Sequence, residues 1–189
     1  MTSDPTAASA TEVHGHTLTG QPEEDPRSVV YRMSAVGRRF RLAVGRIEVA
    51  SAVWRDQCWD IHGVDGGPPL MSLVGGSLDG HTRVALVDHA SRRTATFVPA
   101  EPMSRSHIGV VRDSSGAVIM VVRADGPTGL HMINSVGELL ALSSRRKAPD
   151  GHGCDVLVTP TGAATGRVLV FGVSLALELL RAGGLRRAA

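Results

Sequence analysis

Short clusters of arginine are the clearest chemical signal in this chain. One pair, Arg92-Arg93, stands in a predicted turn, and a second cluster, Arg145-Arg146-Lys147, follows a predicted strand. Guanidinium groups match the geometry of phosphate oxygens, so we expect these five residues to bind anionic lipid head groups or phosphate-bearing ligands weakly. They form a single patch if both segments lie at one end of the fold. Further clusters occupy residues 38–41 and 186–187, and the plainer interpretation of all of them is a solvated basic surface.

Residues with the chemistry of a metal or catalytic site are few and scattered. His152, Cys154 and Asp155 are close together, but zinc needs three or four ligands, and the chain has no second pair at ligand spacing. It also has no glycine-rich phosphate loop and no nucleophile elbow. We therefore expect a protein that is not an enzyme and has no metal and no cofactor. A pocket that gathers His131, His152 and Asp155 would favour the alternative, an enzyme with an unrecognised site.

The two cysteines, Cys58 and Cys154, imply no disulfide framework. We favour free, buried thiols in a reducing cytoplasm, and leave open whether the two ever pair. The N-terminus has no basic start followed by an apolar run, so the sequence does not predict secretion. We expect a cytoplasmic protein, which is peripheral at the membrane if the arginine clusters bind lipid.

The element that must organise these residues is the apolar segment 166–184. A helix over 168–180 is apolar on nearly all sides. Its polar residues fall on one narrow stripe, made of Arg167, Ser174, Glu178 and Arg181. Such a helix must be surrounded by protein or by lipid. The segment is too short for lipid, because a bilayer core requires about 20 apolar residues. We therefore predict a helix buried in a protein core and no transmembrane span.

Glu178 is the ionisable residue within the leucine-rich part of this helix. Burying an unpaired carboxylate is costly, so Glu178 either pairs with Arg181, three residues on, or lies at the mouth of the core where the helix ends. We favour the position at the mouth, and a proton-linked function is a third interpretation. Ser174 is expected to donate to a backbone carbonyl rather than to act as a nucleophile.

Short strands and tight turns are predicted for the chain between residue 28 and this helix. The apolar runs number about twelve, and a short loop separates the last of them from the helix. The runs cover residues 29–35, 40–44, 47–53, 59–64, 70–74, 83–87, 94–98, 108–112, 118–122, 130–134, 138–143 and 155–159. A meander of this length must close or be covered, since its edges would otherwise stay open. We therefore predict a mainly β fold, a closed antiparallel barrel of about twelve strands around the C-terminal helix.

A repeated turn supports the series of hairpins. Asp65, Asp88, Asp113 and Asn134 each follow one apolar strand and precede another, at separations of 23, 25 and 21 residues. Asp and Asn side chains accept hydrogen bonds from the backbone two residues on, and the glycines nearby supply positive φ. The separation corresponds to one hairpin plus its connection.

The turns and the final helix together resemble the tubby C-terminal-like superfold, which includes plant LURP-one-related proteins and phospholipid scramblases. The resemblance covers about residues 28–184. It rests on Asp113-Ser114-Ser115-Gly116, Asn134-Ser135-Val136-Gly137, Cys154-Asp155-Val156-Leu157-Val158 and the helix at 168–180. It implies a closed barrel of about twelve strands with a hydrophobic helix threaded through the middle.

The same resemblance implies a binding function. Tubby proteins bind phosphoinositide head groups through basic residues on the barrel. Scramblase-type members have an acidic calcium-binding stretch before the final helix, but the matching region here offers only Asp150, His152 and Asp155, a poor calcium loop. We therefore expect a non-enzymatic bacterial module that binds a ligand, an anionic lipid or another protein. The alternatives are an unrecognised enzyme and a scramblase-like, membrane-associated protein.

Charge is distributed unevenly along the chain. Residues 1–27 contain five acidic residues and one arginine, which gives −4, so a total of +2 leaves +6 on residues 28–189. The first segment has too little apolar surface to offset the entropy of ordering, and we predict a disordered acidic tail. Residues 28–184 form the barrel domain and 185–189 a short basic tail. With only six aromatic residues for base stacking, we expect no nucleic-acid partner, and we expect a monomer.

Overall fold

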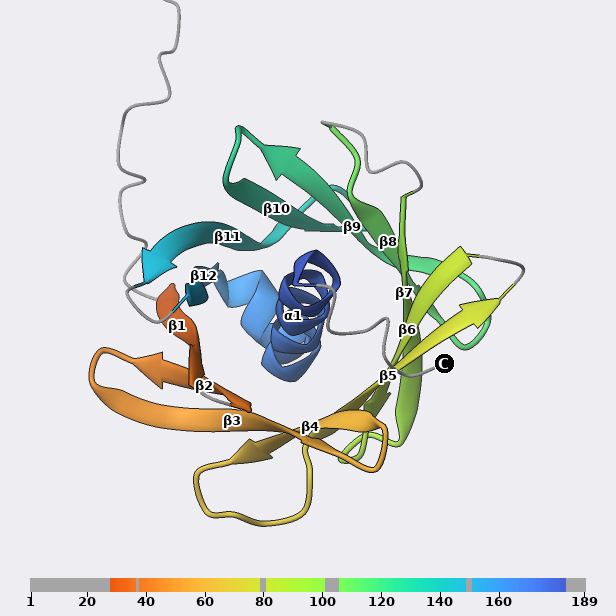
Figure 1. Cartoon of the computed structure of the whole chain (residues 1–189). Helices are drawn as coiled ribbons and strands as arrows, with labels where there is room; N and C mark the ends of the chain where they lie inside the picture. Colours follow the sequence, from red (N-terminus) through yellow and green to blue (C-terminus); the bar gives the residue numbers. More distant parts are fainter. Residues whose placement is uncertain (1–27, 37, 79–80, 101–105, 149–150, 183–189) are drawn as a thin grey trace, which may run out of the picture.

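Twelve antiparallel strands form a closed barrel around a C-terminal helix (Figure 1). The computed structural model describes residues 28–36, 38–78, 81–100, 106–148 and 151–182. The strands are β1 (Val29–Val36), β2 (Arg39–Val44), β3 (Ile47–Arg55), β4 (Cys58–Gly63), β5 (Met71–Leu78), β6 (His81–Asp88), β7 (Arg93–Pro99), β8 (Gly109–Asp113), β9 (Val118–Asp125), β10 (Gly129–Asn134), β11 (Leu139–Ala148) and β12 (Gly151–Val158). Each strand pairs with its neighbours in sequence, and β1 pairs with β12 to close the ring. The predicted fold class is confirmed, and closure leaves no strand edge open.

All twelve predicted strands are present, although some are longer than predicted. The largest extension is in the hairpin of β11 and β12, where Ser144 pairs with Asp155 and Ala148 pairs with Gly151. These added residues are polar or small, so they carry no hydrophobic alternation from which a strand could be predicted. Backbone pairing between the two strands extends the hairpin where the hydrophobic pattern has ended. The predicted tails at 1–27 and 185–189 lie outside the described residues.

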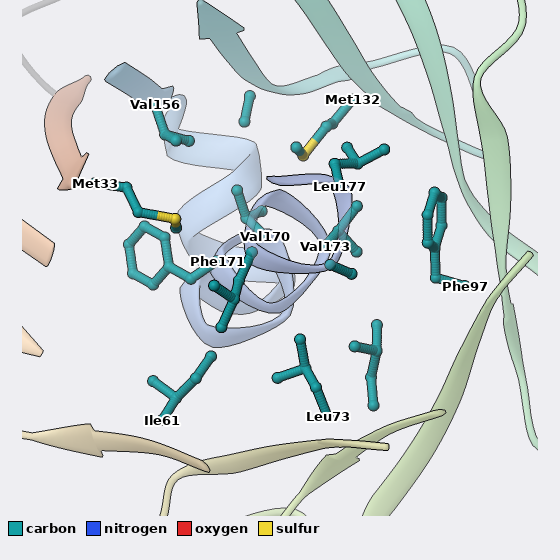
Figure 2. Close-up of a cluster of buried hydrophobic side chains, with 14 of the residues drawn as sticks. Met33, Ile61, Leu73, Phe97, Met132, Val156, Val170, Phe171, Val173 and Leu177 are labelled. Atoms are coloured by element: carbon teal, nitrogen blue, oxygen red, sulfur yellow. The ribbon is translucent and has the colours of Figure 1, made fainter. Parts of the chain in front are cut away.

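Helix α1 (Pro160–Arg181) runs through the centre of the barrel. Residues 170–179 are all buried, which confirms the predicted central helix. Figure 2 shows strand side chains, among them Ile61, Leu73 and Phe97, that point toward the helix. By length and composition α1 could cross a membrane, but its apolar half is enclosed by the strands. The hydrophobicity of the helix is therefore accounted for by the core of the barrel.

The helix begins at Pro160, earlier than predicted, so the expectation of a short loop before it is wrong. Thr159 caps this start, because its Oγ1 accepts a hydrogen bond from the Gly162 amide at 3.1 Å and donates to the Leu140 carbonyl at 3.0 Å. Glycine is required at position 162, since a Cβ atom there would overlap the carbonyl of Leu140. Gly162 and Gly166 disfavour a helix in sequence terms. Gly166 indeed interrupts it, with φ 131° and ψ 101°.

The antiparallel order places alternate connections at opposite ends of the barrel. The turns at Asp88, Asp113 and Asn134 lie at the end where α1 starts, which we call the Thr159 end. The β1–β2, β3–β4 and β9–β10 connections and the last residues of β11 lie at the other end, which we call the Arg181 end. Arg181 itself lines a cavity there together with the β9–β10 turn. Helix α1 therefore runs from one end of the barrel to the other.

Three of the four predicted turn residues make the hydrogen bonds expected of them. Asp88 accepts from the amide of Ala90 at 2.9 Å. Asp113 and Asn134 likewise accept from the amides two residues on, at 2.9 and 3.1 Å. Asp65 lies instead within the longer connection between β4 and β5. These side chains satisfy backbone donors that the strands leave unpaired at the rim.

Candidate anion-binding face

The five predicted basic residues are divided between the two ends of the barrel. Arg92 lies in the β6–β7 turn and Arg93 is the first residue of β7, both at the Thr159 end. Arg145, Arg146 and Lys147 lie in the last part of β11, at the Arg181 end. Because the two groups are at opposite ends, they do not form the single patch that sequence analysis considered.

The two neighbouring arginines of β11 also face opposite sides of the sheet. Arg145 is in register with Cys154, a buried residue of the inner face. Arg146 is in register with Gly153 and therefore belongs to the outer face, since successive residues of a strand alternate. The inner-face position of Arg145 at the mouth of the barrel separates it from the outer surface.

Arg146 instead lies on the same outer surface as the arginine cluster at 38–41, because the pairing of β12 with β1 closes the barrel between them. Arg146 pairs with Gly153, Gly153 pairs with Ser34, and Ser34 pairs with Arg41, so one row crosses β11, β12, β1 and β2. With strands spaced about 4.8 Å apart, the Cα atoms of the two arginines are about 14 Å apart. Gly153 has no side chain, and Ser34 has a small one. No bulky group therefore separates Arg146 from Arg41.

Arg32 and Arg39 extend this surface. Arg32 Nε lies 3.4 Å from Asp155 Oδ1, and Arg146 Nε lies 3.9 Å from the same oxygen. Arg41 Nε lies 3.3 Å from Glu48 Oε2. Arg39 shares the outer side with Arg41, because buried Phe40 lies between them in the strand. The outer surface formed by these four arginines is called the basic face: Arg32, Arg39, Arg41 and Arg146. Their charge exceeds that of the two carboxylates that pair with them.

A cavity of about 400 Å³ adjoins the basic face, and Asp125 and Asp155 are among its lining residues. His131 Nε2 lies 3.0 Å from Asp125 Oδ2, whereas Asp155 pairs with arginines. The side chain of His152 lies outside the described residues. Across the described ranges, no three His, Cys, Asp or Glu side chains are grouped to hold a metal ion. His131 and Asp155 therefore have different partners, and the grouping with His152 that would favour the enzyme alternative lies partly outside the described residues.

A polar cluster of Asp60, Ser72 and His89 was not predicted from the sequence. Ser72 Oγ donates to Asp60 Oδ1 at 2.5 Å and lies 2.8 Å from His89 Nε2. Because a hydroxyl has one proton, the imidazole must be the donor to Ser72. A serine nucleophile requires the reverse, an imidazole that accepts the hydroxyl proton. The cluster therefore ties β4, β5 and the β6–β7 turn together. Only the register of Asp60 with Ser72 reveals it, since the residues are distant in sequence.

Both cysteines are free thiols. Burial, followed by a hydrogen bond to Asp60, raises the pKa of Cys58 to about 11. Burial, followed by the nearby charge of Glu178, raises the pKa of Cys154 to about 12. The thiolate is the form that attacks electrophiles and binds metals. The raised pKa values therefore keep both thiols protonated, and less nucleophilic, at neutral pH.

Glu178 is buried rather than placed at the mouth of the barrel, so the favoured interpretation of this residue is wrong. Its side chain is 3% exposed, and Arg181 Nη1 donates to its Oε1 at 3.0 Å. The pairing with Arg181 that the sequence allowed is confirmed. Ser174 Oγ donates to the Val170 carbonyl at 2.9 Å, as predicted. The two buried members of the polar stripe, Ser174 and Glu178, thus both have partners, whereas Arg167 is exposed.

Comparisons with protein-family models, with curated proteins and with solved structures found no match. The resemblance to the tubby C-terminal-like superfold therefore stays a prediction, and the closed barrel with a central helix is established by the structure alone.

Proposed function

We propose that this protein is a non-enzymatic binding module whose basic face associates with anionic lipid head groups. The observation that carries the proposal is the row from Arg146 to Arg41, in which two arginines flank a stretch of sheet without bulky side chains. Arginine forks bind phosphate oxygens in pairs of hydrogen bonds. Each basic residue near an anionic membrane contributes about 1 kcal/mol, so four of them support weak, reversible association.

The carboxylates on the face are compatible with this function. The side chains of Arg32 and Arg146 are 52% and 36% exposed, and ion pairs at such exposure contribute at most about 1 kcal/mol. A phosphate group can therefore replace Asp155 beside either guanidinium. In the free protein Asp155 Oδ1 lies 3.4 Å from Arg32 Nε and 3.9 Å from Arg146 Nε, so the two arginines already lie near one point before they bind a common ligand.

In this proposal the protein is a peripheral partner of the cytoplasmic membrane surface. Helix α1 stays within the barrel, because its apolar residues already pack against the strands. The proposal agrees with the resemblance to tubby-like barrels and differs from a scramblase-like role, in which the final helix would enter lipid.

Vesicle sedimentation tests the proposal. At low salt, the full chain should pellet with vesicles that contain phosphatidylserine and stay in solution with pure phosphatidylcholine. Raising the salt toward 1 M should release it, because exposed charges are then screened beyond about 3 Å. Equal pelleting with both kinds of vesicle, or binding that does not change with salt, would contradict the proposal.

A further inference from the structure

Ionisable residues are distributed unequally between the two ends of the barrel. When every strand and the helix are divided at their midpoints, the half toward the Thr159 end contains six arginines and six carboxylates among the described side chains, a net charge of zero. The half toward the Arg181 end contains nine arginines and four carboxylates, a net charge of +5. The four carboxylates of this half are Asp56, Asp60, Asp125 and Glu178.

The remaining residues of the strand connections and strand ends at the Arg181 end do not reverse this balance. Five of them are ionisable and have side chains outside the described ranges: Asp79, Glu101, Arg105, Lys147 and Asp150. Three acids and two bases change the net charge by −1, which leaves +4 at this end. A strand of eight residues is about 26 Å long and is tilted by about 40° in a barrel, so the two ends are about 20 Å apart. Because exposed charges are screened beyond about 10 Å at 0.1 M salt, an anionic surface interacts mainly with the end that it approaches.

An exposed aromatic side chain lies at the mouth of the barrel at this positive end. Trp54 shares the inner side of β3 with buried Ala52 but lies beyond the core, and 37% of it is exposed. Its ring centroid lies 5.7 Å from that of Trp59, which packs against the core. The residue before it, Val53, is in register with Arg39 of the basic face. Tryptophan is enriched at membrane–water interfaces, because its indole combines a large apolar ring with a single N–H donor.

Two exposed arginines lie close to Trp54. Arg38 precedes β2 and Arg55 ends β3, so they lie on neighbouring hairpins at the Arg181 end. Neither forms an ion pair with a carboxylate within the described ranges. Asp56 follows Arg55 in the β3–β4 turn and offsets one of these charges. Together with Arg39, the surroundings of Trp54 therefore carry three arginines and one carboxylate.

We propose that the barrel docks on anionic membranes with its Arg181 end toward the lipid, and that Trp54 enters the membrane–water interface. This orientation rests on the proposed function and adds to it the end that faces the membrane and an apolar contact. Three residues of the basic face, Arg39, Arg41 and Arg146, belong to the half toward this end, so the two surfaces are continuous. The Thr159 end, on which the described charges cancel, faces away from the membrane.

Fluorescence quenching tests this orientation, because the chain has only two tryptophans, Trp54 and Trp59. In the full chain with Trp59→Phe, Trp54 is the single reporter. Its emission should shift to the blue when phosphatidylserine vesicles are added, and it should be strongly quenched when those vesicles contain phosphatidylcholine with brominated acyl chains. The matched control carries Trp54→Phe, Trp59→Phe and Val136→Trp, which moves the reporter to an exposed turn at the Thr159 end. The emission of this control should not change.

Sedimentation of the same two reporter chains separates the orientation from the proposed function. If both chains pellet with phosphatidylserine vesicles but Trp54 is not quenched, or the reporter at position 136 is quenched equally, the orientation is wrong and binding by the basic face stands. If neither chain pellets, the proposed function fails and the orientation fails with it.

Arginine variants provide a second measurement that does not depend on fluorescence. Arg38→Ser combined with Arg55→Ser should weaken binding to phosphatidylserine vesicles about thirtyfold, since each basic residue near an anionic membrane contributes. Arg46→Ser combined with Arg92→Ser is the matched control, because these arginines are also exposed but lie in turns at the Thr159 end. The control should bind as the unaltered chain does. Equal losses in the two double variants would overturn the inference.

Discussion

Glu178 and Arg181 form an ion pair at 3.0 Å in the last turns of α1, with the carboxylate inside the barrel and the arginine at its mouth. The two side chains are 3% and 24% exposed. The pair therefore gives the buried carboxylate a partner from its own helix, one turn nearer the Arg181 end of the barrel. Burying a carboxylate without its partner costs far more free energy than the ion pair contributes to stability. Removal of one partner should therefore destabilise the fold more than removal of both.

Replacing Arg181 with Ala should lower the free energy of unfolding by about 3 kcal/mol, because Glu178 then remains buried without its partner. The double variant Glu178→Leu with Arg181→Met should be close to the unaltered protein, since apolar residues can replace such a pair. Urea unfolding of both variants measures the difference. If the Arg181→Ala variant is as stable as the parent, Glu178 needs no partner.

Leu177→Asp tests whether the central helix supports the whole barrel. Leu177 is 1% exposed, and a carboxylate at this position would cost several kcal/mol, a large part of the stability of a domain. We expect loss of the cooperative thermal transition in circular dichroism. Ala164→Asp is the control, because Ala164 is exposed on the same helix and should tolerate the charge. Similar melting of the two variants would refute a buried central helix.

Gly162→Ala tests the docking of the helix start on β11. A methyl group at this position would overlap the Leu140 carbonyl, and such overpacking costs about 1–3 kcal/mol. The melting temperature should therefore fall by several degrees. Gly67→Ala adds the same methyl group in open space and should leave the melting temperature unchanged. If the two substitutions have equal effects, the close approach of α1 to β11 is not present in solution.

The turn between β8 and β9 should contribute stability that depends on pH. The side-chain hydrogen bond from Ser115, joined by bonds from backbone amides, holds the pKa of Asp113 below its usual value of 3.8. Because the pKa is lowered in the folded state, the carboxylate stabilises the fold above pH 3.8, and this contribution disappears as the pH falls through the lowered pKa. Asp113→Asn should therefore flatten the dependence of the urea midpoint on pH between about pH 5 and pH 2.

Asp65→Asn is the matched control for that measurement. Asp65 also lies in a turn, closed by a hydrogen bond from the Gly66 amide to the Gly63 carbonyl, but no described residue donates a hydrogen bond to its carboxylate. This variant should keep the pH dependence of the parent. Identical curves for the variants at 65 and 113 would show that the Asp113 turn does not contribute to acid sensitivity.

The barrel could be predicted because its signals are local. Each strand has its own apolar run, and residues such as Asp113 and Asn134 mark the turns within a few positions. The start of α1 could not be predicted, because Gly162 is required by a contact with Leu140 that exists only in the folded barrel. Helix propensity at Gly162 indicates a loop, and tertiary packing overrides it there, whereas Gly166 does interrupt the helix.

The candidate site was predicted only in part, because strand pairing brings its residues together from distant parts of the sequence. Arg146 was identified as a basic residue, but Arg41, at the other end of the row, is far away in sequence and shares the row only because β1 pairs with β12. Because successive residues of β11 face opposite sides of the sheet, Arg145 and Arg146 point in opposite directions. The prediction had treated the two arginines as parts of one cluster. Asp60, Ser72 and His89 meet through strand register in the same way.

Lipid binding by the basic face is tested most directly by comparing two arginine variants in the vesicle sedimentation experiment. One variant changes Arg32, Arg41 and Arg146 of the basic face to Ser, and the other changes Arg92 and Arg93, at the opposite end of the barrel, to Ser. The loss of three cations from the face should remove most of the binding to phosphatidylserine vesicles, at about 1 kcal/mol for each residue, while the second variant should bind as the unaltered chain does. Retained binding by the first variant, or an equal loss in both, would contradict the assignment of lipid binding to the basic face.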